Sequence, residues 1–227
     1  MKQSLHNHIY KRILSLCIIL FSCLTHVSAR EYSSEVGTMW NFTLSKQIDR
    51  VNLQLQQNVW TLGRYYERYM SIVAVSYTVV PKYIKLNALY YYMNQQTPPG
   101  TYNNRNRYHV GATFSCPVDR LSISLNSRFE STYTVGTAQP LNKWRNKLLF
   151  SYAIPNSRWT PFFHTDIFLL LNGSKSGNLD RVWYDAGVEY RIDPKNSIEC
   201  KVREEHLINK TPQQLNTFIS FAYKLKL

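Results

Sequence analysis

Cysteine is scarce in this chain, and the few cysteines form no recognisable framework. The 227 residues include four cysteines, of which Cys17 and Cys23 lie in an apolar N-terminal segment. Cys116 and Cys200 remain, and two cysteines do not make the disulfide framework of a small secreted scaffold. No Cys/His pattern with metal-ligand spacing is present. We therefore expect neither a metal site nor a cofactor, and we interpret both cysteines as small hydrophobic residues.

Long apolar runs are also missing. After the N-terminal segment, no stretch reaches 18 consecutive apolar residues, so the sequence offers no further candidate for a transmembrane helix. No long linker or shift in composition divides residues 30–227 either. These residues are therefore expected to form a single domain.

The first 29 residues have the pattern of a cleaved secretory signal. Lys2, Lys11 and Arg12 give a basic start, Ile13–Leu24 is apolar, and Val27-Ser28-Ala29 provides a small-x-small cleavage site. The apolar core is too short to span a bilayer, which needs about 20 residues. An uncleaved anchor is one alternative. A lipoprotein signal around Leu20-Phe21-Ser22-Cys23 is another, although the bulky phenylalanine disfavours it.

What the sequence has in abundance is alternation of apolar and polar side chains. In the last segment Ile219, Phe221, Tyr223, Leu225 and Leu227 share one face of a strand, opposite polar or small residues. About eleven such segments follow one another from Trp40 onward. The pattern predicts an all-β protein, an antiparallel up-and-down transmembrane β-barrel of 10–12 strands.

The expected connections alternate in length, as they do in outer-membrane barrels. Short ones are predicted at Gln47–Arg50, Pro81–Lys82, Pro117–Asp119, Pro155–Ser157 and Asp193–Asn196. Longer ones are predicted at Thr61–Tyr69, Asn94–Asn106, Ser131–Asn142, Asn172–Asp180 and His206–Gln213. Because such barrels usually have an even number of strands, we favour twelve strands over ten.

A soluble barrel or sandwich would alternate too, with its apolar face turned inward. The aromatic content favours the membrane, because 17 Tyr, 10 Phe and 5 Trp suit the aromatic girdles of a membrane barrel. Aromatic residues expected in these girdles are Trp40, Trp60, Tyr92, Tyr108, Trp144, Trp159 and Tyr190. The expected location is the outer membrane of a Gram-negative cell. If the protein were soluble, a periplasmic lipid-binding barrel would be the alternative.

Several short pieces, in order along the chain, resemble one family. They are Trp40–Lys46, Arg107–His109, Trp144–Lys147, Thr160–Asp166 and, most strongly, Asp180–Arg191. The chain resembles the domain of unknown function 2490 family, which comprises uncharacterised bacterial outer-membrane proteins common in Bacteroidetes. The resemblance implies a membrane barrel and brings no established active site. Two departures are Asp166, where a glutamate is expected, and a final Leu227 in place of an aromatic residue.

Charged residues fall on the face opposite the apolar one, which would line the lumen. The candidate lumen network consists of Arg107, Arg128, Glu130, Arg145, Lys147, Asp166, Arg181, Asp185, Glu189, Arg191, Glu199, Lys201, Arg203 and Glu205. Small barrels fill their interior with side chains, and buried charges must pair to offset desolvation. The network is therefore interpreted as structural, and a charged constriction that favours anions is the functional alternative.

An enzyme is the least favoured class. His109, His164 and Asp166 share the inward parity, so a histidine–carboxylate pair could act with Ser122 or Ser124 on a neighbouring strand. Residues two apart on a strand are about 7 Å apart at Cα, and no Gly-x-Ser-x-Gly motif is present. We expect no catalytic residues, and a hydrolase acting on lipid or peptide stays an alternative.

The excess of basic residues, 27 against 14 acidic ones, usually indicates an anionic partner. Export makes nucleic acid an unexpected partner. The expected partners are outer-membrane lipid, including lipopolysaccharide, whose phosphates Arg105 and Arg107 would contact, and the barrel-assembly machinery through the C-terminal strand. The oligomeric state is left open.

Overall fold

Eleven β-strands make up the part of the chain that the structure describes. The computed structural model describes residues 33–227 except residues 64, 97–99 and 174–175, so the predicted signal peptide lies outside the described residues. Residues Ser33–Leu227 form one compact unit. The strands are β1 Ser33–Ile48, β2 Val51–Leu62, β3 Tyr65–Val80, β4 Ile84–Gln96, β5 Tyr102–Val118, β6 Leu121–Thr134, β7 Leu141–Tyr152, β8 Trp159–Leu170, β9 Leu179–Arg191, β10 Asn196–Leu207 and β11 Gln214–Lys226.

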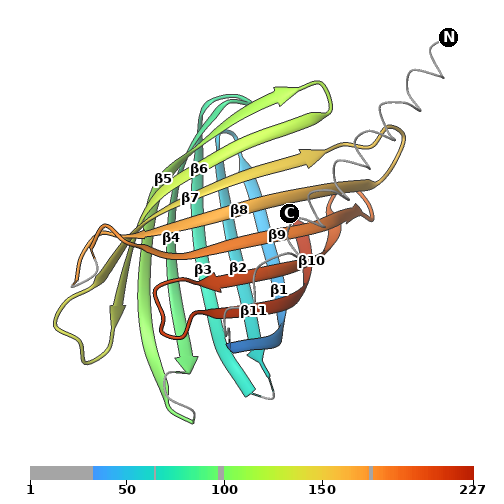
Figure 1. The fold of residues 1–227 in the computed structure, drawn as a ribbon. Helices are drawn as coiled ribbons and strands as arrows, with labels where there is room; N and C mark the ends of the chain where they lie inside the picture. Colours follow the sequence, from blue (N-terminus) through green and yellow to red (C-terminus); the bar gives the residue numbers. More distant parts are fainter. Residues whose placement is uncertain (1–32, 64, 97–99, 174–175) are drawn as a thin grey trace. The chain divides into compact units, whose positions relative to one another are not determined.

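The strands close into a barrel in which each strand pairs with its neighbours in the sequence (Figure 1). This confirms the predicted all-β barrel. The predicted range of 10–12 strands is confirmed, but the preference for twelve was wrong, because eleven strands form the barrel. The predicted antiparallel pairing was also wrong at one place, because β1 and β11 pair in parallel. An odd number of alternating strands leaves the first and last running in the same direction, so a closed barrel of eleven strands needs one parallel pair.

The two rims of the barrel differ in their connections. The turn rim carries the connections that follow β1, β3, β5, β7 and β9, together with the C-terminus, and the loop rim carries those that follow β2, β4, β6, β8 and β10.

At the turn rim, Asp193 accepts hydrogen bonds from the Asn196 side chain and from the backbone N–H groups of Lys195 and Asn196. These bonds hold the pKa of the Asp193 carboxyl below its usual value.

The long connections are shorter than predicted, because the strands extend into them. Most of the predicted loop Thr61–Tyr69 is strand, since β2 ends at Leu62 and β3 begins at Tyr65. Similarly, Asn94 and Asn104 lie in strands β4 and β5, and their side chains are joined by a hydrogen bond of 2.9 Å. Asn- and Gln-rich sequence resembles a loop, but here its side chains bond to one another across the ladder and continue the sheet.

The outer wall of the barrel is apolar. The exposed large hydrophobic residues fall on the parity predicted for the oily face, for example Trp40, Val73, Val110, Ile167 and Phe221. Aromatic pairs lie on this wall, including Trp40–Phe221 at 5.1 Å and Trp159–Tyr190 at 4.5 Å between ring centroids. Among the described residues, no helix is long and apolar enough to cross a membrane.

The interior contains an apolar cluster as well as charges. Its buried members are Met39, Trp60, Met70, Ile72, Tyr91, Met93, Phe168, Trp183 and Phe218. Most come from β1–β4 and β11, on the part of the wall that lacks the predicted charges. Trp60, predicted to belong to an outer girdle, is only 4% exposed and points into this cluster. The lumen is therefore filled with side chains at this level, and we call the cluster the central plug.

Candidate functional site: the charged lumen

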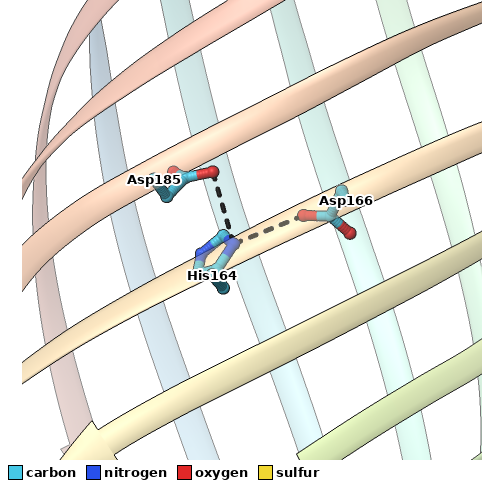
Figure 2. A group of neighbouring side chains, drawn as sticks. All are labelled: His164, Asp166 and Asp185. Atoms are coloured by element: carbon cyan, nitrogen blue, oxygen red, sulfur yellow. Dashed lines mark ion pairs between the residues drawn. The ribbon is translucent and has the colours of Figure 1, made fainter. Parts of the chain in front are cut away.

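The centre of the lumen holds a histidine between two carboxylates. His164 and Asp166 are two residues apart on β8, and Asp185 lies opposite His164 on β9 (Figure 2). His164 Nδ1 is 3.5 Å from Asp166 Oδ2 and 3.4 Å from Asp185 Oδ2. All three side chains are buried, with both aspartates fully inaccessible. Alternation on β8 and pairing with β9 thus bring these groups together.

Basic side chains neutralise both of these carboxylates. Arg145 Nε donates to Asp166 Oδ1 at 2.7 Å. Arg203 Nε donates to both oxygens of Asp185 at 3.0 Å, and Lys201 Nζ is 3.4 Å from Asp185 Oδ1. A buried carboxylate is costly unless it is paired and hydrogen-bonded, and these contacts supply the pairing.

The same arginines stack on aromatic rings of the central plug. The Arg145 guanidinium carbon lies 4.8 Å from the ring centre of Trp183, and the guanidinium carbon of Arg203 lies 4.0 Å from the same ring centre. Arg203 also lies 5.4 Å from the ring centre of Trp60, which Arg68 approaches to 4.4 Å. We call this series the arginine–tryptophan stack. It joins β7, β9, β10, β2 and β3, so it crosses the lumen and connects the charged wall to the apolar one.

A second group of charges lies closer to the loop rim. Glu130 Oε2 is 3.1 Å from His109 Nε2, and Glu130 Oε1 is 3.4 Å from Arg107 Nε. Glu130 is 1% exposed, so both bases contact a carboxylate that water hardly reaches. Arg107 also donates to Thr132 at 2.8 Å. This group ties β5 to β6.

A third group connects β9 to β10 and to β7 near the loop rim. Glu205 Oε1 accepts from Arg181 at 3.0 Å and from the indole N–H of Trp183 at 2.8 Å. Asp180 Oδ2 accepts from Lys143 at 2.7 Å and from Arg181 at 2.8 Å. The indole of Trp183 is therefore fixed both by its stacking arginines and by a carboxylate.

Near the turn rim the inward-facing side chains are less covered. Lys224 Nζ donates to Glu189 and to Glu199 at 2.6 Å each, and Lys201 is 3.4 Å from Glu199. These residues are partly exposed, in contrast to the buried groups above. Within the part of the chain that the structure describes, Arg128 and Lys147 take part in no ion pair, and Arg128 Nε is buried without a hydrogen-bond acceptor. The interior thus has more bases than its carboxylates neutralise.

The structure brings most of the predicted network together. Thirteen of its members lie in the three groups or beside them, on the inward faces of β5–β10, and Arg191 is exposed at the turn rim. The contact of Arg105 and Arg107 with glycolipid phosphates stays a prediction, and the orientation of the two arginines does not favour it. Both arginines face the lumen, where Arg105 donates to Gln95 at 3.1 Å and Arg107 contacts Glu130.

Sequence reasoning missed several lumen residues. Arg68, Lys143 and Asp180 lie at strand ends, in or beside segments interpreted as loops, and Trp60 and Trp183 were not recognised as inward-facing. A signal existed for Trp183, because it shares the parity of Arg181 and Asp185. An aromatic residue on the charged face indicates a stacking partner for the arginines around it.

The arrangement is poorly suited to nucleophilic catalysis. Ser124 and His164 are not on neighbouring strands, because β7 lies between β6 and β8, with Ser124 opposite Leu149 and Leu149 opposite His164. Adjacent strands are about 4.8 Å apart, which puts the two backbones roughly 10 Å apart. The expectation that the serines would lie on a strand next to His164 was wrong.

The side chains of His164, Asp166 and Asp185 at the centre of the lumen are also of the types that bind a divalent cation. One ligand atom from each of His164, Asp166 and Asp185 lies within 4.8 Å of the others. However, Arg145, Arg203 and Lys201 already contact the carboxylates. A metal ion would have to displace these cations or lie beside them, so the set does not fit a metal centre.

Comparison with protein families agrees with this fold. The model of the family described as Protein of unknown function (DUF2490) matches residues 37–216. The chain belongs to this family. The match begins within β1 and ends within β11, and it includes every residue of the charged groups described above except Lys224. No curated protein matches the chain.

Proposed function

We propose that this DUF2490 protein is an outer-membrane β-barrel without enzymatic activity, whose lumen is blocked by the central plug and its paired charges. The observation that carries the proposal is the placement of polarity: apolar side chains face outward and carboxylates with 0% exposure face inward. A water-soluble barrel would have the reverse arrangement.

The dimensions of the wall support this proposal. The shortest strands have 12 residues, such as β2 and β8. At about 3.3 Å per residue and a tilt of about 40°, such a strand spans about 30 Å of wall, which matches the hydrocarbon core of a bilayer. Exposed aromatic residues near both rims, such as Tyr108 and Trp159, suit the interfaces on either side.

The filled lumen supports a structural or recognition role over transport. Met93 and Phe218 are 0% exposed, and the arginine–tryptophan stack crosses the interior at a similar level. Ion pairs on the charged wall fix the side chains that would have to move for a solute to pass. A general pore is therefore disfavoured.

A narrow anion-favouring channel is the second candidate. The surplus of bases in the lumen, with Arg128 and Lys147 outside any ion pair among the described residues, favours anions over cations. Conduction would require the central plug to open.

Gel mobility and conductance test these proposals together. Unheated protein extracted from the outer-membrane fraction should migrate as a compact species and shift to its unfolded position on boiling. In planar bilayers the purified protein should give no discrete channels. Recovery in the soluble fraction without a shift would contradict the membrane proposal, and anion-selective steps would support the channel instead. Absence of labelling by a fluorophosphonate probe is expected, and labelling that is lost in Ser124→Ala would revive the hydrolase.

A further inference from the structure

Nearly all exposed basic residues in the described part of the barrel lie at one rim. Ten basic residues are exposed in the described part of the chain, and nine of them lie at the turn rim. We call these nine the basic ring: Lys46, Arg50, Lys82, Lys85, Arg120, Arg158, Arg191, Lys195 and Lys226. The tenth, Lys210, is in the last connection of the loop rim.

The basic ring extends around the whole circumference. Each of the five connections at this rim has one exposed base, namely Arg50, Lys82, Arg120, Arg158 and Lys195 in the order of the chain. Because these connections follow alternate strands of a closed barrel (Figure 1), the bases that they carry are distributed around it and are not confined to one side.

The charges of the basic ring are not neutralised within the protein. Exposed acids at the turn rim are Asp49, Asp119 and Asp193, so nine bases face three acids. Among the described residues, no member of the ring is in an ion pair, in contrast to the lumen, where most bases are paired. Asp193 is also occupied by hydrogen bonds to its own turn. The ring therefore presents a net positive potential to whatever surrounds it.

The wall next to the basic ring is apolar and aromatic. Tyr77 and Trp159 are exposed near strand ends at this rim, and Tyr83 is exposed in the turn between β3 and β4. Tyr223 stacks on Phe42 with 6.0 Å between the ring centroids. Aromatic residues in this position mark the boundary between hydrocarbon and headgroups in a membrane barrel. The bases of the ring lie just beyond these aromatic residues, where the headgroup phosphates of such a membrane would be.

We propose that the basic ring binds the headgroups of anionic phospholipids in the leaflet that surrounds the turn rim. This inference rests on the proposed membrane location. Short turns and the C-terminus of outer-membrane barrels face the periplasm, so the surrounding leaflet consists of phospholipids. Basic residues at a membrane surface attract anionic lipids, and the attraction is screened by salt. Among the described residues, the uneven distribution of exposed bases also favours this rim over the loop rim for anionic contacts.

Lipid selectivity measured with spin-labelled phospholipids tests the inference. The full barrel is reconstituted in phosphatidylcholine vesicles, and the motionally restricted fraction is compared for labelled phosphatidylglycerol and labelled phosphatidylcholine. We expect a severalfold preference for phosphatidylglycerol that declines as salt is added. Equal restriction of the two lipids would overturn the inference.

Variants with opposite effects on charge make the test specific. A fourfold variant should lose most of the preference for phosphatidylglycerol; its changes are Arg50→Gln, Lys82→Asn, Arg120→Gln and Lys195→Gln. Asparagine is chosen at residue 82 because it tolerates the φ of 71° found there. Asp49→Asn with Asp119→Asn should increase it, and asparagine again suits the positive φ of both positions. Lys210→Gln, at the loop rim, should leave it unchanged. Persistence of the preference in the fourfold variant would contradict the inference.

Two further outcomes separate the possible failures. If no restricted lipid is seen and the protein shows no heat-dependent gel shift, the membrane location itself is wrong. If restricted lipid is seen without selectivity, while polyglutamate binds the reconstituted barrel and loses its binding in the fourfold variant, the ring recognises a soluble acidic polymer and the phospholipid assignment is overturned.

Discussion

Arg203 lies 4.0 Å from the ring centre of Trp183 and donates to both carboxylate oxygens of Asp185, so one guanidinium joins the charged wall to the central plug. Asp185 is fully buried and its other basic neighbour, Lys201, is 3.4 Å away. This contact bears directly on the stability of the barrel.

Arg203→Met should lower the free energy of unfolding by about 3 kcal/mol, because removing one partner leaves a buried carboxylate incompletely paired. Urea unfolding in lipid vesicles, followed by tryptophan fluorescence, measures the loss. Arg191→Met is the matched control, since Arg191 is exposed at the turn rim and its loss should cost less than about 0.5 kcal/mol. Equal effects of the two changes would refute a special role for Arg203.

Arg145 and Asp166 should behave as a coupled pair in a double-mutant cycle. Arg145→Met and Asp166→Leu should each cost about 3 kcal/mol, while the double variant should cost clearly less than their sum, because no lone charge stays buried. The same unfolding assay gives the three values. Additive costs would show that the 2.7 Å contact contributes no interaction energy of its own.

Gly37 is expected to be essential for closing the barrel. A Cβ at this position would lie 2.1 Å from the carbonyl oxygen of Thr61 and 2.8 Å from the ring of Phe218, its partner across the parallel pair. Gly37→Ala should cost about 3 kcal/mol through overpacking and reduce the heat-resistant species on gels. Gly136→Ala meets no atom within 4 Å and has a φ of +85°, so it should cost only about 1 kcal/mol of backbone strain. A Gly37→Ala barrel as stable as Gly136→Ala would disprove the close approach.

The parallel pairing of β1 with β11 can be tested by cross-linking. Trp40→Cys and Phe221→Cys, with Cys116 and Cys200 changed to serine, place two thiols directly opposite each other on the outer wall. Oxidation should then produce a disulfide, visible as a mobility change of the boiled protein that reductant reverses. Trp40→Cys with Tyr223→Cys, offset by two residues, should cross-link much more slowly. Faster linkage of the offset pair would place the register elsewhere.

Divalent cations should not stabilise the barrel. Millimolar Zn²⁺ is expected to leave the unfolding midpoint unchanged, because Arg145, Arg203 and Lys201 contact the carboxylates around His164. Thermal gel-shift curves with and without the metal measure this. An increase in the midpoint that His164→Ala abolishes would establish a metal site.

The period-two pattern predicted the strands and the direction in which their side chains face. It could do so because each strand, taken alone, shows which of its two faces is apolar. The number of strands was harder to predict. The preference for twelve relied on the rule that a fully antiparallel barrel closes with an even number of strands. Nothing in the residues of β1 or β11 indicates that these two strands pair in parallel. Strand ends were misassigned where asparagine, glutamine and charged residues continue the ladder, as at Asn94 and Arg68.

The lumen was predicted from the sequence only in part. Inward parity identified Asp166 and Asp185, but their distances to His164 depend on the register between β8 and β9. The stack of Trp60 and Trp183 with arginines from three other strands depends on packing across the barrel. Such contacts join residues far apart in the sequence, which no local pattern encodes.

The seam between β1 and β11 differs from every other ladder in the time at which it can form. The other ten join strands that follow one another in the sequence, whereas Asn41 and Ser220, joined by a 3.1 Å hydrogen bond, are 179 positions apart. Hairpins can therefore form progressively as the chain is delivered, but the last ring closure must wait for β11 and carries the largest loop entropy. Until then β1 and β10 are open edges that could pair with other chains. A chain that ends before β11 should therefore aggregate rather than persist as a smaller barrel.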